Sequence, residues 1–305
     1  MERKSIFLTG GTGFFGKSIL SMLRRGSGKG FEFTVLSRDP KMFLADNPEF
    51  SGLEQVHFIS GDIRSFDFPQ HSFDYVLHAA APARAMPPGV ERDIVVNGTR
   101  RILAFAERCH ARRLLFVSSG AVYGPQPPDL ERIPEDFPCR PVTEYGIAKF
   151  EAEQMCKDSG IECVIARCFA FVGPYLPRDI HFAVGNFIRD CLAGNDIEIK
   201  GDGTPYRSYL YADDLVRWLF AVLFRGTPRR AYNIGSDRAV SIRELAETVR
   251  NVLGSKNRIV VRRTPDPGKP PERYVPEISR IRRELNVSIE TDLEDAILKT
   301  VGSSR

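Results

Sequence analysis

The feature that most constrains this chain is a glycine-rich turn that directly follows an apolar strand near the N-terminus. The segment from Ser5 to Thr9 predicts a buried strand, and glycines follow at positions 10, 13 and 16. Gly10 permits a tight turn, Gly13 lets a ligand approach the backbone, and Gly16 lets the next helix pack closely. The residues from Lys17 to Arg25 continue at a helical period. This order places a pyrophosphate at a helix N-terminus and predicts a dinucleotide site; the alternative is an ordinary strand-to-helix turn.

Length and composition exclude several classes of protein. The 305 residues are 42% hydrophobic and 27% charged, which is typical of a soluble globular chain with one large or two modest domains. No apolar run approaches the length of a membrane span, and the first strand begins too early to leave room for a signal peptide. We therefore expect a cytoplasmic protein with no membrane partner.

Cysteine and charge patterns point away from metals and nucleic acids. The six cysteines form no metal-ligand pattern, so we expect free thiols and no metal site. The net charge of +4 suits an anionic small ligand without specifying one. We interpret the basic clusters at Arg112-Arg113 and Arg280 to Arg283 as solvated faces rather than a nucleic-acid surface.

Strands and helices alternate through the first half of the chain. Further strands are predicted at 31–36, 56–59, 73–78, 114–117 and 161–166, and the clearest helical pattern between them runs from Val90 to His110. Such alternation predicts an α/β fold with a doubly wound parallel sheet. Ligands bind such sheets at the carboxyl ends of the strands, so the residues at those ends are the candidates for binding.

Three of these strand ends carry residues suited to the rest of a dinucleotide. Ser37-Arg38 ends the second strand, where NAD sites usually carry an acidic residue. An arginine suits the 2′-phosphate of NADP(H), which is therefore favoured over NAD(H), although a plain surface arginine is the alternative. In Gly61-Asp62-Ile63, the aspartate can accept a hydrogen bond from the adenine amino group. His78-Ala79-Ala80-Ala81 ends the fourth strand with small residues beside a histidine that we interpret as packed rather than catalytic.

The fifth strand leads to a candidate proton-transfer centre. It runs into Ser118-Ser119, and a later helix carries Tyr145 and Lys149 one turn apart on the same face. An ammonium beside a phenol favours the phenolate, and a nearby serine hydroxyl can share the substrate proton. Tyr145 is then usable as an acid or base near neutral pH.

Taken together, these motifs resemble an extended short-chain dehydrogenase/reductase of the nucleotide-sugar epimerase/dehydratase family. The matching segments cover nearly the whole chain in the family's order. They are Thr9 to Gly16, Gly61 to Ile63, His78 to Ala80, Asn97 to Thr99, Ser118 to Gly124, Tyr145 to Lys149, Arg167 to Pro174, Gly201 to Gly203, Arg207 to Asp214 and Tyr232 to Gly235.

The resemblance implies a Rossmann-type fold and roles for particular residues. Tyr145 would be the acid/base, Lys149 would hold the nicotinamide ribose, and Ser119 would bond the substrate oxygen. Arg207 resembles the arginine that binds the diphosphate of a nucleotide-diphosphate sugar, and Arg273 is a candidate for a second such arginine. Asn186 resembles a residue that contacts the backbone and a phosphate. For the arginines, a salt bridge to a neighbouring helix is the alternative. The expected cofactor contacts are Gly10, Gly13, Phe14, Phe15, Gly16, Ser37, Arg38, Asp62, Ile63, Ala79, Ala80 and Lys149.

Two departures from the family pattern bear on the reaction. Family dehydratases carry Thr-Asp-Glu where this chain has Ser119-Gly120-Ala121, so 4,6-dehydration is disfavoured. Ala170 stands where the family usually has an asparagine that contacts substrate. The remaining reaction is hydride transfer at C4 of a hexose, for which we favour net reduction of a 4-keto sugar over 4-epimerisation, the alternative. A different class of function, a non-catalytic regulator that senses the dinucleotide, also stays open. Cys139 lies near Tyr145 in sequence but has no evident partner to lower its pKa.

The family pattern also implies a domain organisation. Residues 1–172, with 205–235 returning, would form the dinucleotide-binding domain. Residues 173–204 and 236–305 would form a smaller, discontinuous substrate domain, with a helix capped by Ser241 and Glu244 and a proline-rich loop from Pro265 to Pro271. A homodimer through the helices at 90–110 and 143–159 is the expected assembly.

Overall fold

A computed structural model describes residues 3–28, 30–82, 86–180 and 182–302. The chain divides into two compact units by its internal contacts. The first comprises Met1–Gly124, Cys139–Cys168 and Val216–Tyr232, and the second comprises Pro125–Pro138, Phe169–Leu215 and Asn233–Arg305. The assignment of cofactor binding to one domain and substrate binding to the other stays a prediction.

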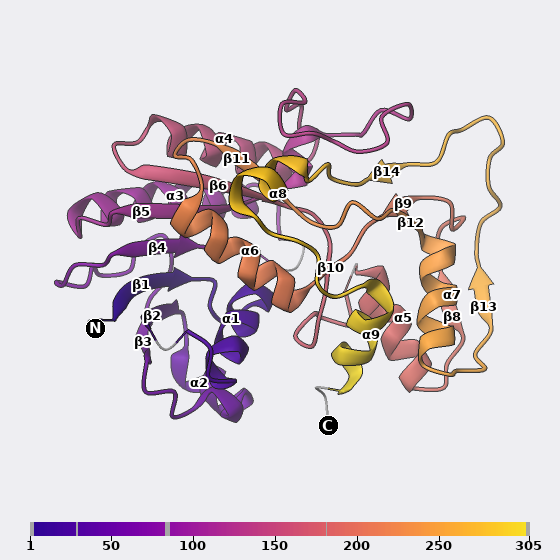
Figure 1. The fold of residues 1–305 in the computed structure, drawn as a ribbon, viewed down its shortest axis with the longest axis horizontal. Coiled ribbons are helices and arrows are strands. Elements are labelled where there is room, and N and C mark those ends of the chain that lie inside the picture. The colour runs from indigo at the N-terminus through magenta and orange to yellow at the C-terminus, as the bar shows by residue number, and fades with distance from the viewer. Residues whose placement is uncertain (1–2, 29, 83–85, 181, 303–305) are drawn as a thin grey trace. The chain divides into compact units, whose positions relative to one another are not determined.

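The first unit is built around a seven-stranded sheet in the order β11-β6-β5-β4-β1-β2-β3 (Figure 1). Its strands are β1 (Lys4–Thr9), β2 (Phe31–Ser37), β3 (Val56–Ser60), β4 (Tyr75–His78), β5 (Arg113–Ser119), β6 (Glu162–Cys168) and β11 (Ala231–Ile234). Every pairing from β3 across to β6 is parallel. The prediction of a doubly wound parallel sheet is therefore confirmed.

Helices cover both faces of this sheet (Figure 1), and its inner strands β4, β5 and β6 are buried along nearly their whole length. The helices of the first unit are α1 (Phe14–Arg24), α2 (Pro40–Asp46), α3 (Val90–Arg108) and α4 (Glu144–Asp158), with short 3₁₀ turns η1 (Pro48–Phe50) and η2 (Gly120–Tyr123). Helix α6 (Ala212–Arg225) presents Phe220 and Phe224 to Phe31 of β2, with ring centroids 5.9 and 5.2 Å from that of Phe31.

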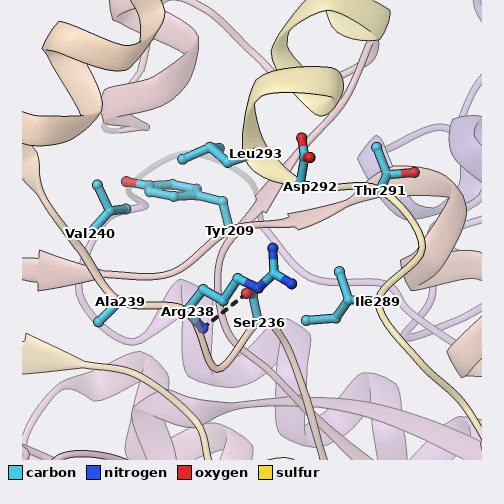
Figure 2. A pocket seen from close by; sticks show the side chains of 9 residues that line it. All are labelled: Tyr209, Ser236, Arg238, Ala239, Val240, Ile289, Thr291, Asp292 and Leu293. Atoms are coloured by element: carbon cyan, nitrogen blue, oxygen red, sulfur yellow. Dashed lines mark hydrogen bonds between the residues drawn. The ribbon is translucent and has the colours of Figure 1, made fainter.

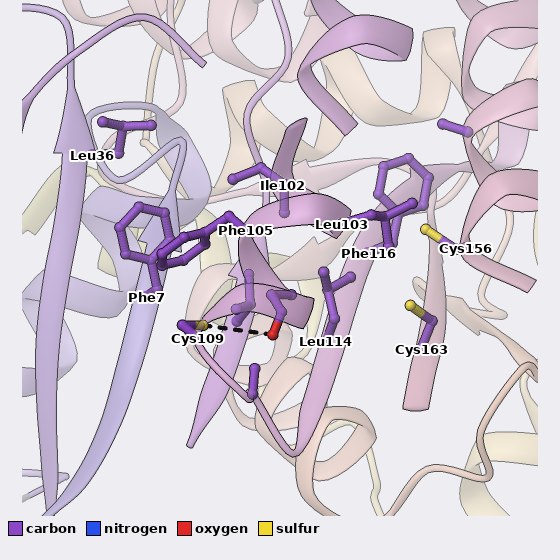
Figure 3. Close-up of a cluster of buried hydrophobic side chains, with 14 of the residues drawn as sticks. Phe7, Leu36, Ile102, Leu103, Phe105, Cys109, Leu114, Phe116, Cys156 and Cys163 are labelled. Atoms are coloured by element: carbon purple, nitrogen blue, oxygen red, sulfur yellow. Dashed lines mark hydrogen bonds between the residues drawn. The ribbon is translucent and has the colours of Figure 1, made fainter. Parts of the chain in front are cut away.

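A cluster of phenylalanines forms the core between the sheet and α3 (Figure 3). Phe7 of β1 is fully buried, and its ring centroid lies 4.4 Å from that of Phe105 on α3 and 5.3 Å from that of Phe73. The same cluster takes in Ala148, Ala152 and Cys156 of α4. Burying aromatic side chains of this size contributes roughly 1.5–3 kcal/mol each, so the core fixes α3 and α4 against the strands that carry the candidate site.

In its described residues, the second unit contains short strands and four helices of its own. The strands are β7 (Phe171–Val172), β8 (Ile197–Ile199), β9 (Tyr206–Arg207), β10 (Leu210–Tyr211), β12 (Val240–Ser241), β13 (Ile259–Val261) and β14 (Arg273–Tyr274). The helices are α5 (Ala183–Leu192), α7 (Ile242–Val252), α8 (Ser279–Leu285) and α9 (Leu293–Gly302). Helix α7 begins with the predicted capping box, in which Ser241 and Glu244 bond each other's backbone amides. No helix among the described residues is long and apolar enough to cross a membrane.

Candidate active site

The glycine turn after β1 has the shape that the sequence predicts. Gly10 has φ of +72°, and a Cβ there would lie 2.5 Å from the carbonyl oxygen of Ala79. A Cβ on Gly16 would lie 2.1 Å from the Cα of Gly11, so Gly16 serves the packing of α1 onto the turn itself. A Cβ on Gly13 would meet only the Gly10 carbonyl at 3.5 Å. The protein therefore leaves open the space in front of Gly13 that a pyrophosphate would need.

The ends of β2 and β3 carry the other predicted cofactor residues. Arg38 is exposed directly after β2, and its carbonyl accepts a bond from the Ser60 hydroxyl at 3.2 Å. The Asp62 carboxylate accepts three bonds from Arg64, two from its side chain at 2.8 and 2.9 Å and one from its backbone amide at 2.9 Å, and this pairing lowers the pKa of Asp62 to about 2. Asp62 is thus ionised at neutral pH and keeps capacity to accept one further bond.

His78 at the end of β4 is a packed residue, as the sequence predicts. Its side chain is 1% exposed, with Nδ1 2.8 Å from the Thr9 hydroxyl and Nε2 3.0 Å from that of Thr99. The Thr99 hydroxyl donates to the Val95 carbonyl, so it must accept from His78, which assigns the proton to Nε2. Burial lowers the pKa of His78 to about 3. The histidine is neutral and tied into the sheet.

The three predicted catalytic residues all belong to the first unit. Ser119 ends β5, and its Oγ accepts a bond from the Ala121 amide at 3.1 Å. Tyr145 stands in the first turn of α4. A Cβ on Gly146 would lie 2.7 Å from the Ala121 carbonyl oxygen, so glycine at this position lets α4 pack against the turn that follows Ser119. This close approach explains why a glycine follows the tyrosine.

Lys149 lies one turn along α4 from Tyr145 and is 1% exposed. Its Nζ donates to the Val117 carbonyl at 2.8 Å and lies 5.8 Å from the centroid of the Tyr145 ring. Burial lowers the pKa of Lys149 to about 8, which leaves it mostly protonated at neutral pH. Two donor hydrogens remain on Nζ after the bond to Val117, as a contact to a ribose requires.

A buried ion pair beside Lys149 was missed by the sequence analysis. Glu153 of α4 is 0% exposed and pairs with Arg167 of β6, Nη2 to Oε2 at 2.8 Å. Ser118 donates its hydroxyl to Glu153 Oε1 at 2.6 Å, and Arg167 donates to the Tyr123 hydroxyl at 3.0 Å. The spacing of four residues from Lys149 to Glu153 was the available signal, but it is also the spacing of an ordinary exposed ion pair on a helix.

The two candidate diphosphate arginines lie on neighbouring strands of the second unit. Arg207 in β9 donates to the Tyr206 carbonyl at 2.8 Å and lies 3.8 Å from the Glu272 carboxylate. Arg273 in β14 pairs in register with Tyr206, and its guanidinium lies 4.4 Å from the centroid of that ring. Successive side chains alternate faces, so the backbone directs Arg207 and Arg273 to opposite faces of this small sheet. The register alone does not bring the two guanidinium groups to one phosphate.

Asn186 of α5 presents an unusual polar atom. Its Nδ2 donates to the Ile180 carbonyl at 2.7 Å. Its Oδ1 is buried and has no hydrogen-bond partner among the described residues. A phosphate oxygen cannot donate to that acceptor, so a phosphate contact would use the second hydrogen on Nδ2.

A separate cavity of about 180 Å³ in the second unit contains none of the predicted site residues. Its lining includes Tyr209, Ser236, Arg238 and Asp292, shown in Figure 2.

All six cysteines are free, and burial raises the pKa of Cys139, so its thiol does not ionise near neutral pH. Within the described ranges, no group of three histidine, cysteine, aspartate or glutamate side chains is placed to hold a metal ion.

Known proteins resemble this chain over almost its whole length. UDP-glucuronic acid decarboxylase 1 from Danio rerio is 28% identical over 315 residues, covering 98% of this chain and 72% of that protein. A dTDP-glucose 4,6-dehydratase from Streptomyces griseus is 29% identical over 319 residues, covering 97% and 92%. The crystal structure of a dTDP-glucose 4,6-dehydratase from Streptomyces venezuelae, with NAD and TYD bound, is 26% identical, with a TM-score of 0.83 and coverage of 98% and 96%.

A family model gives the assignment. The model of the NAD dependent epimerase/dehydratase family matches residues 6–235, which include the glycine turn, Ser119, Tyr145 and Lys149. The match spans well over half of the 305 residues. This chain belongs to the NAD dependent epimerase/dehydratase family.

Proposed function

We propose that this protein is an enzyme that transfers hydride at C4 of the hexose in a nucleotide-diphosphate sugar, with a nicotinamide dinucleotide as cofactor. The observation that carries the proposal is that the open glycine turn after β1 and the residues Ser119, Tyr145 and Lys149 are all built into one sheet-centred unit. The similar decarboxylase and dehydratases, named for sugar nucleotides, support this substrate class.

The residues present define the proton chemistry. Tyr145 takes the proton of the C4 hydroxyl during oxidation, or gives it back during reduction of the ketone. Ser119 has its hydroxyl hydrogen available for the substrate oxygen, because its Oγ serves as acceptor for the Ala121 amide. Lys149 supplies positive charge beside the tyrosine from a nearly water-free position. The bound nicotinamide supplies or accepts the hydride.

The finer proposal is net reduction of a 4-keto sugar nucleotide with NADPH. The exposed Arg38 after β2 supports an exchanging NADP(H), because a guanidinium suits a 2′-phosphate. Positions 120 and 121 of η2 are glycine and alanine, so the turn after Ser119 offers no carboxyl pair for elimination of water. 4-Epimerisation is the second candidate, because the family is described as NAD dependent and an epimerase returns the hydride from the same retained cofactor.

One experiment distinguishes these outcomes. The purified protein is treated with acid to release and identify its cofactor, and is then incubated with sugar nucleotides and their 4-keto-6-deoxy derivatives while NADPH absorbance is followed. Stoichiometric loss of NADPH with a ketosugar supports the reductase, and inversion at C4 without net redox change identifies an epimerase. A protein that binds the dinucleotide and a partner protein, yet remains inert with every sugar nucleotide, would instead be a regulator.

We also propose that the enzyme acts in the cytoplasm as a homodimer through α3 and α4. Val142, just before α4, is 68% exposed, and Ile147 on α4 is 45% exposed, so apolar side chains are available on that helix's outer side. Light scattering at micromolar concentration tests the assembly, and a monomer would refute it.

A further inference from the structure

The buried ion pair in the first unit joins α4, the helix of Tyr145 and Lys149, to strands β5 and β6. Glu153 is bound by three groups: the Ser118 hydroxyl at 2.6 Å, Arg167 Nε at 3.0 Å and Arg167 Nη2 at 2.8 Å. Both members of the ion pair are nearly fully buried, at 0% and 4% exposure. Burying a carboxylate costs several kcal/mol unless it is paired and bonded, so a carboxylate kept here calls for a role.

The geometry links this carboxylate to Lys149 in two ways. Tyr145, Lys149 and Glu153 follow one another at intervals of four residues along α4 and so share one face of the helix. The same helix face is bonded to two consecutive residues of β5: Lys149 donates to the Val117 carbonyl, and Glu153 accepts from the Ser118 hydroxyl. The next residue of β5 is Ser119.

Glu153 is one of the acidic groups whose charge favours the ammonium form of Lys149. The groups that act on Lys149 are Cys168 of β6, Cys156 and Glu153 of α4, and Glu91 of α3, with neutral His78 on β4. Burial raises the pKa of both Cys156 and Cys168 above the ordinary thiol value, so neither carries charge near neutral pH. The carboxylates that remain are Glu153, held in the interior, and Glu91, which is half-buried.

We propose that Glu153 is a positioning residue of the catalytic centre: its carboxylate, fixed by Ser118 and Arg167, keeps the buried Lys149 an ammonium and aligns α4 with the end of β5. The consequence for Tyr145 rests on the proposed function, because Lys149 must be charged for the tyrosine to take a proton. The charge on Lys149 itself is a property of the protein that can be measured without any substrate.

The test follows the titration of Lys149 directly. Protein labelled with ¹³C in lysine gives a Cε signal for Lys149, which is identified by its loss in Lys149→Met. In Glu153→Gln the midpoint of this titration should shift to lower pH, because removal of a nearby carboxylate favours the neutral amine. Glu151→Gln is the matched control: Glu151 lies on the same helix and pairs with Arg92 at 2.7 Å on the exposed surface. Its removal should leave the midpoint unchanged.

A second variant keeps the test possible if Glu153→Gln does not fold. Glu153→Gln leaves Arg167 buried and unpaired, whereas Glu153→Gln with Arg167→Gln removes both charges and is tolerated more easily. Loss of the Arg167 charge raises the midpoint of Lys149, whereas loss of the Glu153 charge lowers it, so the double variant is compared with Arg167→Gln, from which it differs only at Glu153. The midpoint should be lower in the double variant than in Arg167→Gln. A wild-type midpoint in folded Glu153→Gln, or equal midpoints in the other two variants, overturns the proposal.

Activity provides an independent readout once a substrate is known. In Glu153→Gln the alkaline limb of the kcat profile should move to lower pH, whereas Glu151→Gln, which keeps the Glu153 carboxylate and its bonds, should leave that limb in place. An inert protein in which the Lys149 midpoint still falls would contradict the proposed function and leave this inference standing. An alkaline limb unmoved in an active Glu153→Gln would overturn the link from Glu153 to catalysis.

Discussion

At the scale of single residues, Tyr145 is the proposed acid and base at the substrate oxygen. Tyr145→Phe keeps the aromatic ring beside Lys149 but removes the hydroxyl, so kcat should fall by roughly two to four orders of magnitude while dinucleotide affinity is kept. Steady-state kinetics with the substrate found above, and calorimetry with the cofactor, measure the two effects. Tyr75→Phe is the control, because Tyr75 begins β4, at the opposite end of the strand from the candidate site. Near-normal turnover in Tyr145→Phe would refute the mechanism.

Gly13 tests the cofactor site at the same scale. Gly13→Asp would place an anion where the pyrophosphate is expected, so calorimetry should detect no dinucleotide binding. Gly13→Ala is the matched control for folding, because the added Cβ meets only the Gly10 carbonyl at an ordinary 3.5 Å. Both variants should keep a wild-type melting temperature. Unchanged affinity in Gly13→Asp would show that the dinucleotide does not bind at this turn.

At the scale of elements, the approach of α4 to η2 sets the distance between Tyr145 and Ser119. In Gly146→Ala the new Cβ would lie 2.7 Å from the Ala121 carbonyl oxygen, so the two elements must separate. Small misplacements of catalytic groups cost up to about 100-fold in rate, and we expect a loss of about 10- to 100-fold in kcat. Alanine favours a helix over glycine by about 0.5–1 kcal/mol, so denaturant unfolding should show little loss of stability.

The control for this variant is Gly160→Ala, because Gly160 follows the end of α4 and a Cβ there would meet only the Glu107 carboxylate, at an ordinary 3.8 Å. Its kcat should stay near the wild-type value. If Gly146→Ala had the same kcat as the wild type, the close packing of α4 on η2 would not be what positions the catalytic residues.

Elements also show where sequence reasoning succeeds and fails. The glycine turn and the Tyr145-Lys149 pair were predictable because each is a local pattern whose residues interact over one turn or one helix step. Glu153 was not predictable, because a glutamate on a helix is usually solvated and its burial depends on Ser118 and Arg167 from two separate strands. Local spacing cannot reveal which charged side chains the tertiary fold buries.

At the scale of the whole molecule, the alternation of strands and helices predicted the sheet, whereas the second unit was predicted only in outline. Strands of two residues, such as β9 and β14, are too short to show an alternating pattern and form because tertiary contacts align them. The segment Pro125–Pro138 groups with the second unit, although it lies between two parts of the first. Nothing in its composition marks that grouping.

The stability of the whole molecule should depend on pH through His78. Its pKa is about 3 in the folded protein and 6.5 when exposed, so between these values the unfolded chain binds more protons and unfolding becomes easier as the pH falls. His78 contributes stability that is complete above pH 6.5 and is lost at about 1.4 kcal/mol per pH unit below it. Urea unfolding at pH 7.5 and 5.5 should therefore show a smaller difference in His78→Gln than in the wild type. Equal pH dependence in the wild type and His78→Gln would mean that the histidine is protonated inside the folded sheet, although Nδ1 is placed to accept from the Thr9 hydroxyl while Nε2 donates to that of Thr99.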